Sequence, residues 1–235
     1  MVNKPSVKLA NVAEDKAVVA GVTYSCDAFG IIHQHPPFAK FCYDREYVRS
    51  RYDTIPETVA CMSHLRLGIL LSHCSEGSLL DVGYGNGAFL SLAKRAGFAC
   101  YGVDVSGYPA PDGVVTLDWL KDGLRIMAQD WEAVTFFDSL EHIHSLDFML
   151  SIRARHVVIT APWCHEGPQG AWFREWKHRR PHEHLHHFRP YTLQRFMARC
   201  GYEMLWFGSP EDIIRLADDD LANTFTAVFR KERWT

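Results

Sequence analysis

The 235-residue sequence has no run of 18 consecutive apolar residues, so no segment is long enough to cross a bilayer as a helix. Its first residues also lack the continuous apolar core of a secretory signal peptide. We therefore expect no membrane partner and a cytoplasmic location. Internal repeats and low-complexity segments are missing too, and a hydrophobic content of 47% is that of an ordinary globular domain.

A large charge of either sign is also missing, because 25 basic residues stand against 28 acidic ones. Such a balance provides no global attraction to nucleic acid or to anionic lipid. A nucleic-acid partner is therefore not favoured, although the basic stretch 177–180 follows Trp172 and Trp176, which can stack on bases. The sequence does not indicate an oligomeric state.

The C-x2-C spacing of common zinc ribbons is absent. The seven cysteines are scattered and odd in number, and we expect them to be reduced. One group offers four side chains of the types that zinc accepts, namely Cys26, His33, His35 and Cys42. The alternative is that this aromatic-rich stretch packs as a lid over a cleft.

Glycine is concentrated where the sequence is most informative. An apolar run at 79–82 has the length of a strand and leads into a turn with glycine at 83, 85 and 87. Apolar residues then recur at helical spacing until Gly97, which predicts a strand, a tight loop and a helix. Such glycines let a ligand approach free N–H groups at the helix start. A second strand at 99–103 delivers Asp104, whose carboxylate can accept hydrogen bonds from a ribose diol. The unit is typical of a nucleoside-cofactor site.

The loop reads D-x-G-x-G-x-G, not the G-x-G-x-x-G of dinucleotide-binding proteins, which disfavours a nicotinamide dehydrogenase. It resembles motif I of the class I S-adenosylmethionine (SAM)-dependent methyltransferases. Residues 134–143 are similar to that family's fourth-strand motif, fDvlEHl, and 186–203 to its late H-h-F-t-p…aGF segment. With three matches in order over 78–207, the sequence resembles the type 11 and type 23 methyltransferases.

The resemblance implies an α/β fold with a Rossmann-like sheet of seven mostly parallel strands, the last one antiparallel, flanked by helices. The sequence pattern predicts the strands at 79–82, 99–103, 114–117, 133–137, 156–160, 202–207 and 225–230. A helix should begin at Thr54 with reciprocal capping by Glu57, while 106–113 is too rich in glycine and proline for a helix.

Three regions are expected from the sequence. Residues 1–53 should form an N-terminal arm and a helical, aromatic lid, with an edge strand around 17–20, and in relatives such a helix closes over the bound cofactor. Residues 54–235 should form the methyltransferase domain. Within it, 160–189 is expected to be a loop on the substrate side, because loops of that length are usually functional.

The resemblance also implies the cofactor, SAM, and its product S-adenosylhomocysteine (SAH). The residues expected to hold it follow the first four strands: Asp81, Gly83, Tyr84, Gly85, Gly87, Asp104, Val105, Asp118, Trp119, Asp138 and Ser139. In the family an acidic residue at the third strand often accepts the adenine amino group. Asp118 can equally be the N-cap of the next helix.

The sulfonium of SAM is already electrophilic, so the protein has mainly to align a nucleophile and remove its proton. Histidine titrates near working pH, and the catalytic candidates are His142, the adjacent Glu141, and His184. In relatives the Glu-His pair often only braces the loop. We expect methyl transfer to an oxygen, nitrogen or carbon of a small or medium-sized acceptor.

Alternatives remain within this chemistry and outside it. Asp138-x-x-Glu141-His142 with a distant histidine resembles the E-x-x-E-H set that binds a divalent metal in small-RNA 2′-O-methyltransferases and some ubiquinone-biosynthesis enzymes, although the first acid here is Asp. A nucleotide or nucleic-acid acceptor is the first alternative, weakened because the Asn/Asp-Pro-Pro-Tyr/Phe motif is absent. Another is a protein that binds SAM or SAH without turnover.

Overall fold

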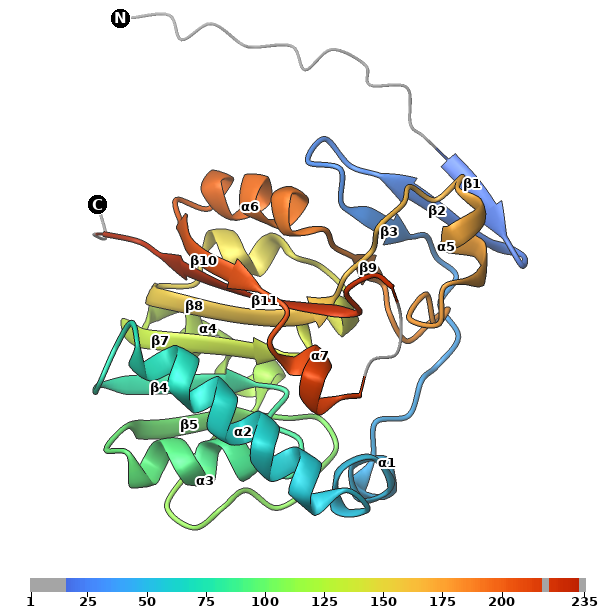
Figure 1. Cartoon of the computed structure of the whole chain (residues 1–235). Coiled ribbons are helices and arrows are strands. Elements are labelled where there is room, and N and C mark those ends of the chain that lie inside the picture. The colour runs from blue at the N-terminus through green and yellow to red at the C-terminus, as the bar shows by residue number, and fades with distance from the viewer. Residues whose placement is uncertain (1–15, 217–219, 233–235) are drawn as a thin grey trace, which may run out of the picture.

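The centre of the protein is a seven-stranded sheet in a computed structural model that describes residues 16–216 and 220–232 (Figure 1). The strands lie side by side in the order β10-β11-β8-β7-β4-β5-β6. Only β11 among them runs antiparallel to its neighbours, so the predicted Rossmann-like sheet with an antiparallel last strand is confirmed. Their bounds are β4 (Ser78–Val82), β5 (Ala99–Val103), β6 (Val115–Leu117), β7 (Trp131–Phe137), β8 (Ala154–Pro162), β10 (Glu203–Gly208) and β11 (Thr224–Arg230).

Helices cover both faces of this sheet. Those with eight or more residues are α2 (Pro56–Leu71), α3 (Ala88–Arg95), α4 (Trp119–Ala128) and α6 (Pro190–Arg199). Leu70 of α2 and Phe89 of α3 pack on one face, whereas Ile126 of α4 and Leu193 of α6 pack on the other. Because both faces are covered, the central strands are apolar on both sides. Short helices are α1 (Arg45–Val48), α5 (Ala171–Glu175) and α7 (Glu211–Ile214).

The start of α2 differs from the prediction. The helix begins at Pro56, its N-cap is Ile55, and no side chain caps it. The Thr54 hydroxyl instead donates to the Ser50 carbonyl, 2.9 Å away, because residues 49–53 continue α1 as a π-helical turn. The predicted capping between Thr54 and Glu57 is therefore wrong. The irregular connection at 106–113 is confirmed, since these residues form no helix or strand.

A second, smaller sheet joins two distant parts of the chain. β1 (Lys16–Val19), β2 (Val22–Cys26) and β3 (Ile32–Gln34) form an antiparallel meander, and β9 (His186–His187) pairs with β3. Figure 1 shows this sheet beside α5, next to the end of β8. The two segments share a core of their own, made of Val19, Tyr24, Ile32, Cys164, Phe173 and Trp176. The strand expected around 17–20 is thus the edge strand β1, and the rest of the predicted arm, 1–15, lies outside the described residues.

The candidate zinc ligands of the N-terminal stretch do not come together. His33 Nδ1 lies 2.8 Å from His186 Nδ1 and its Nε2 lies 3.1 Å from Asp27, while His35 forms a hydrogen bond with Ser25. The potential metal-ligand groups found among the described residues include none of the four. All seven cysteines are free thiols. In the described part of the chain no helix is long and apolar enough to cross a membrane.

Candidate active site

The glycine loop connects β4 to α3 in the predicted way. Gly83, Gly85 and Gly87 have φ angles of 82°, 57° and 75°, a region that side chains with a Cβ rarely adopt. A Cβ on Gly83 would lie 2.6 Å from the Cβ of Ser139, so this glycine is also required by close approach. The Ser139 hydroxyl donates to the Val82 carbonyl at 2.6 Å. The loop is therefore in direct contact with the segment after β7.

Asp104 follows β5 and holds the loop from the other side. One carboxylate oxygen accepts the Gly85 N–H at 2.9 Å, and the other accepts the Ser106 N–H at 2.8 Å. The adjacent Val105 is 75% exposed. Tyr84 points toward this strand end, and its hydroxyl donates to the Tyr108 carbonyl. This end of the sheet thus presents a carboxylate next to the backbone of the glycine loop.

Asp81 lies beneath the loop rather than on its surface. It is 2% exposed, and the Thr135 hydroxyl donates to its carboxylate at 2.7 Å. Burial raises the pKa of Asp81 to about 7, against the lowering effect of that hydrogen bond. The arrangement ties β4 to β7 directly below the loop.

Asp118 and Trp119 stand at the neighbouring strand end, because Val103 pairs with Leu117. The Asp118 carboxylate accepts the N–H groups of Leu120 and Lys121, so it is the N-cap of α4. Trp119 contacts Phe148 edge to face, with ring centroids 5.1 Å apart. Of the two roles considered for Asp118, the structure contains the N-cap.

Asp138 belongs to a partly buried network of charges that the sequence did not predict. Its carboxylate accepts hydrogen bonds from Arg66 of α2, at 2.8 Å, and from Arg215. Glu211 of α7 accepts from the same two guanidinium groups. Although burial opposes ionisation, Arg215 and Arg66 hold the pKa of Asp138 well below its usual range. Asp138 itself has a φ of 54°, so the network fixes a strained turn at the end of β7.

The three catalytic candidates come together after this turn. Glu141 and His142 form a single 3₁₀ turn, and His184 approaches from the 160–189 segment. Glu141 is 1% exposed and neither of its carboxyl oxygens has a hydrogen-bond partner. The Nε2 of His142 lies 3.9 Å from Glu141 Oε1, and the rings of His142 and His184 have centroids 4.8 Å apart.

Backbone carbonyls fix the state of both imidazoles. His142 Nδ1 lies 2.8 Å from the Glu183 carbonyl, and His184 Nδ1 lies 2.7 Å from the His178 carbonyl. A carbonyl only accepts, so each Nδ1 carries the proton and each Nε2 keeps a free lone pair. Burial lowers the pKa of both histidines, and burial followed by the charge of Asp138 raises the pKa of Glu141. The cluster is thus two neutral imidazoles facing a carboxyl group that resists ionisation.

Tyrosines from the N-terminal region lie over both parts of the site. The Tyr43 hydroxyl is 2.7 Å from His142 Nδ1, and a Cβ on Gly85 would be 3.1 Å from the Tyr52 ring. Asp53 accepts hydrogen bonds from Asn86 of the glycine loop and from the Tyr108 hydroxyl. Residues 43–53 therefore join the glycine loop to the histidine cluster.

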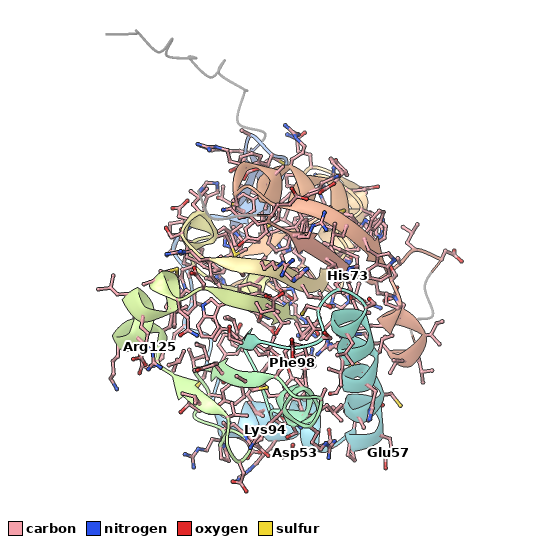
Figure 2. The ribbon with its side chains drawn as sticks, turned by 90° about the vertical axis from the view of Figure 1, so that its left-hand side faces the viewer. Asp53, Glu57, His73, Lys94, Phe98 and Arg125 are labelled. Carbon is pink, nitrogen blue, oxygen red and sulfur yellow. The ribbon has the colours of Figure 1, made fainter. Side chains whose placement is uncertain are left out.

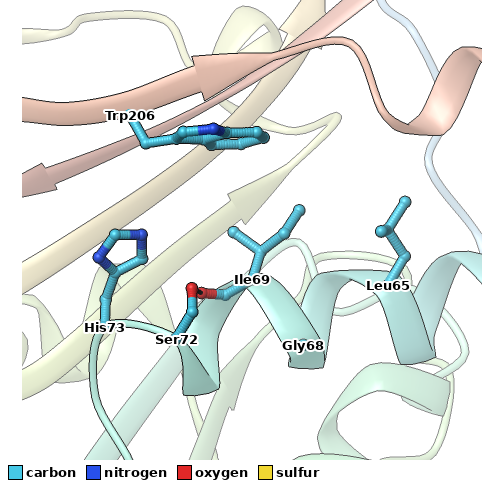
Figure 3. A pocket seen from close by; sticks show the side chains of 6 residues that line it. All are labelled: Leu65, Gly68, Ile69, Ser72, His73 and Trp206. Carbon is cyan, nitrogen blue, oxygen red and sulfur yellow. Dashed lines mark hydrogen bonds between the residues drawn. The ribbon is translucent and has the colours of Figure 1, made fainter.

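Sequence reasoning missed Arg66, Arg215 and Glu211. Arg66 was the one detectable signal, because an arginine stands within the apolar pattern of α2, and such a residue needs a buried partner. Two surface hollows of the described structure lie away from the candidate residues. One is lined by α2 and Trp206 (Figure 3), the other by the start of β7 and Lys231.

Residues 55–205 match a protein family described as a methyltransferase domain, which covers more than half of the chain. No curated protein matches the sequence. Among solved structures, the Burkholderia thailandensis 1,6-didemethyltoxoflavin-N1-methyltransferase with bound substrate and SAH is 13% identical, with a TM-score of 0.54 over 92% of this chain and 98% of the other. Magnesium protoporphyrin IX methyltransferase of Synechocystis with SAH is 10% identical, with a TM-score of 0.54 over 80% and 92%.

A third similar structure comes from a Haloferax volcanii complex between the Trm112 methyltransferase activator and a methyltransferase. It is 12% identical, with a TM-score of 0.57 over 83% of this chain and all of the other. At these identities the likeness concerns the fold, and the family match covers the glycine loop, the Asp138 turn and the histidine cluster. The chain belongs to the class I SAM-dependent methyltransferase domain family.

Proposed function

We propose that this protein transfers the methyl group of SAM to an oxygen, nitrogen or carbon of a small or medium-sized acceptor. The observation that carries the proposal is the contact between Gly83 and Ser139. It brings the glycine loop against the segment that bears Glu141 and His142. A nucleoside cofactor held by the loop would therefore lie next to a buried group that can remove a proton.

The loop and Asp104 have the donor and acceptor set that SAM requires. Asp104 stands where a carboxylate meets ribose hydroxyls, and the loop glycines expose backbone N–H groups to the amino-acid end of the ligand. Bound SAM supplies an electrophilic methyl group. Val105, Asp118 and Trp119, which follow the neighbouring strand ends, are the proposed surroundings of the adenine.

His142 is the proposed general base. Its Nδ1 proton is held by the Glu183 carbonyl, so Nε2 can accept the proton that an acceptor hydroxyl or amine loses as it forms its new bond to carbon. His184 is oriented in the same way by the His178 carbonyl, and Glu141, whose pKa is raised by burial, lies beside them. The burial that keeps both rings neutral also excludes water.

We also propose that residues 1–53 supply the lid and that 160–189 contribute to the acceptor side. Tyr52 lies directly against Gly85, on the face that a cofactor would approach, so it has to move when SAM enters. The Tyr43 hydroxyl contacts His142, so the same lid reaches the proposed base. His184, from the 160–189 segment, lies against the ring of His142. This unit of lid and loop is the part of the chain that can exclude water during transfer.

A second candidate is a metal-assisted methyltransferase, favoured by the unpartnered carboxyl of Glu141. One ligand atom each of Glu141, His142 and His184 lies within 4.8 Å of the others. Carbonyl-bound Nδ1 atoms are the usual support of metal-binding histidines. Such an ion would lower the pKa of a bound acceptor hydroxyl. Asp138, the remaining acid of the motif, is engaged by Arg66 and Arg215.

Calorimetric titration with SAM and SAH tests the cofactor site. We expect wild type to bind both, and Asp104→Ala to weaken binding by about 1.5 to 3 kcal/mol, roughly 10- to 150-fold, since it removes hydrogen bonds to a carboxylate. Asp112→Ala, an exposed aspartate on the following turn, is the matched control and should bind like wild type. Folded wild type that binds neither ligand contradicts the proposal.

Turnover separates the remaining alternatives. Release of SAH that depends on a small acceptor supports the proposed function; release with RNA or DNA alone favours the nucleic-acid acceptor; and tight binding without release favours a non-catalytic binding protein. Loss of turnover on chelation, with recovery on adding Mg²⁺ or Mn²⁺, favours the metal-assisted form. A cytoplasmic location, inferred from the sequence, is checked by cell fractionation.

A further inference from the structure

A second group of potential metal ligands lies at the opposite edge of the sheet from the glycine loop. Cys74 stands between α2 and β4, Glu132 near the start of β7, and His156 near the start of β8. One ligand atom of each lies within 4.8 Å of the other two. The strand register brings them together, because Ala133, next to Glu132, pairs with His156 on one side and with Leu79 on the other.

This group is remote from the proposed reaction. The parallel strands β4, β7 and β8 start at this end of the sheet, and the glycine loop follows the other end of β4. Figure 2 shows His73, the neighbour of Cys74, and Asp53 at opposite ends of α2. Asp53 is the residue that contacts Asn86 of the glycine loop. The cluster therefore does not belong to the active site described above.

Two of the three side chains are buried, and one buried nitrogen has no hydrogen bond. Cys74 is 8% exposed and His156 5% exposed. The Nδ1 of His156 has no hydrogen-bond partner, although Glu132 Oε1 lies 3.4 Å from it. Burial lowers the pKa of His156 and raises the pKa of Cys74 to about 12. Without a metal ion, burial therefore favours the uncharged imidazole and the uncharged thiol that lie beside Glu132.

We propose that Cys74, Glu132 and His156 bind a structural zinc ion. Thiolate sulfur, imidazole nitrogen and carboxylate oxygen are the three ligand types that Zn²⁺ accepts in proteins. Two ligands about 2.1 Å from a tetrahedral ion lie roughly 3.4 Å apart, and the observed separation of His156 Nδ1 and Glu132 Oε1 is 3.4 Å. A bound ion would hold the Cys74 sulfur as thiolate, with the proton released to solvent, and would satisfy the unpartnered nitrogen.

The fourth position and the entry path are both available. His73 is partly exposed, lies two residues beyond the end of α2, and is close enough to lower the pKa of His156. It lines a hollow of about 320 Å³ with Ser72 and Trp206 (Figure 3). Glu132 lines a second hollow, of about 550 Å³, beside Ser78 and Asp130. Arg155, 3.7 Å from Glu132, is mostly exposed, so its side chain can turn outward when Glu132 binds the ion.

Zinc at this place would fix the connection from α2 to β4 against the starts of β7 and β8. Its contribution is to the folded state, because the three ligands converge only there. The proposal thus makes no use of SAM or of the acceptor. It can fail or succeed independently of the proposed methyl transfer.

Cobalt titration of the chelator-treated full chain tests the site. Co²⁺ bound to a thiolate gives a sulfur-to-metal charge-transfer band in the near ultraviolet, which the Glu141 group, lacking sulfur, cannot produce. We expect wild type to bind one Co²⁺ ion per chain with this band. Zn²⁺ should displace the Co²⁺ and abolish the band, and Cys74→Ser should not show it. Cys61→Ser, which removes an exposed cysteine of α2, should keep the band.

Glu132→Gln provides a second variant that leaves the buried residues in place, and we expect at least tenfold weaker Co²⁺ binding. Zn²⁺ should also raise the Tm of wild type and of Cys61→Ser but not that of Cys74→Ser. Folding of each variant is followed by circular dichroism. Absence of the charge-transfer band in wild type, or its persistence in a folded Cys74→Ser protein, overturns the proposal.

Discussion

At the scale of single residues, the chemistry of the candidate site depends on the hydrogen-bond partners of the Nδ1 atoms of His142 and His184. His142 and His184 are neutral with free Nε2 atoms because carbonyl groups hold both Nδ1 protons and burial disfavours the charged form. The same burial raises the pKa of Glu141 and so disfavours its negative charge. Burial therefore disfavours the charged form of all three side chains.

The proposed base predicts a definite pH profile. Because the pKa of His142 is lowered below its ordinary value of about 6.5, Nε2 stays unprotonated through pH 6.5 and activity falls only at lower pH. His142→Asn should reduce kcat/KM by about 10² to 10⁴-fold, the usual contribution of a general base. The rate of SAH release, measured against pH for wild type and for His142→Asn, checks the pH profile and the effect of the substitution. An acidic limb centred above 6.5, or one unchanged in His142→Asn, contradicts the assignment.

Glycines provide a matched pair of substitutions with opposite signs. In Gly83→Ala the alanine has to adopt a positive φ, and its Cβ lies 2.6 Å from that of Ser139. We expect the free energy of unfolding to fall by about 1 to 3 kcal/mol, and SAM binding to weaken as well. Gly123 lies inside α4 with nothing within 4 Å of an added Cβ. Gly123→Ala should stabilise by about 0.5 to 1 kcal/mol. Urea unfolding measures both, and equal effects would show that backbone conformation does not limit the loop.

At the scale of elements, a partly buried charge network connects α2 and α7 to the end of β7. Arg66 contributes to two ion pairs, with Asp138 and Glu211, and its side chain is 11% exposed. The 3₁₀ turn with Glu141 and His142 starts just after Asp138. The network thus sets the direction in which the catalytic candidates leave the sheet.

Removing Arg66 leaves the buried Glu211 and the partly exposed Asp138 with Arg215 alone. We expect Arg66→Ala to cost about 3 to 5 kcal/mol, whereas Arg125→Ala, on the exposed side of α4, should change stability by less than about 0.5 kcal/mol. The pKa of Asp138 is depressed, so its stabilising contribution exists above the ordinary carboxyl pKa and is lost as pH falls through that range and below. Urea unfolding at pH 7 and pH 3 should show a smaller Arg66→Ala effect at the lower pH. A constant difference would argue against this coupling.

At the scale of the whole molecule, the small sheet connects the start of the chain to the 160–189 segment. β9 follows His184 by two residues and pairs with β3, so the N-terminal meander supports one of the three catalytic candidates. Phe173 is fully buried between Tyr24 and His187, with centroids 5.2 and 5.3 Å away. The site is therefore assembled from both sheets.

Phe173→Ala should loosen this connection without disturbing the glycine loop. We expect about 3 to 5 kcal/mol of local destabilisation, faster amide hydrogen exchange at 184–188, and unchanged exchange at 79–87. Val18→Ala, an exposed position in β1, is the control and should leave both segments unchanged. Equal acceleration in the two segments would mean that the sheets unfold as one unit.

Local sequence pattern was enough to predict the large sheet, the glycine loop and the place of Asp104. These features depend on apolar runs of strand length, glycine spacing and one carboxylate at a strand end. It also drew attention to Glu141, His142 and His184. Tertiary structure decided what lies around them. The charge pairs of Arg66, the carbonyl partners of the histidines and the pairing of β3 with β9 join residues far apart in the chain, and neither periodicity nor spacing encodes such contacts.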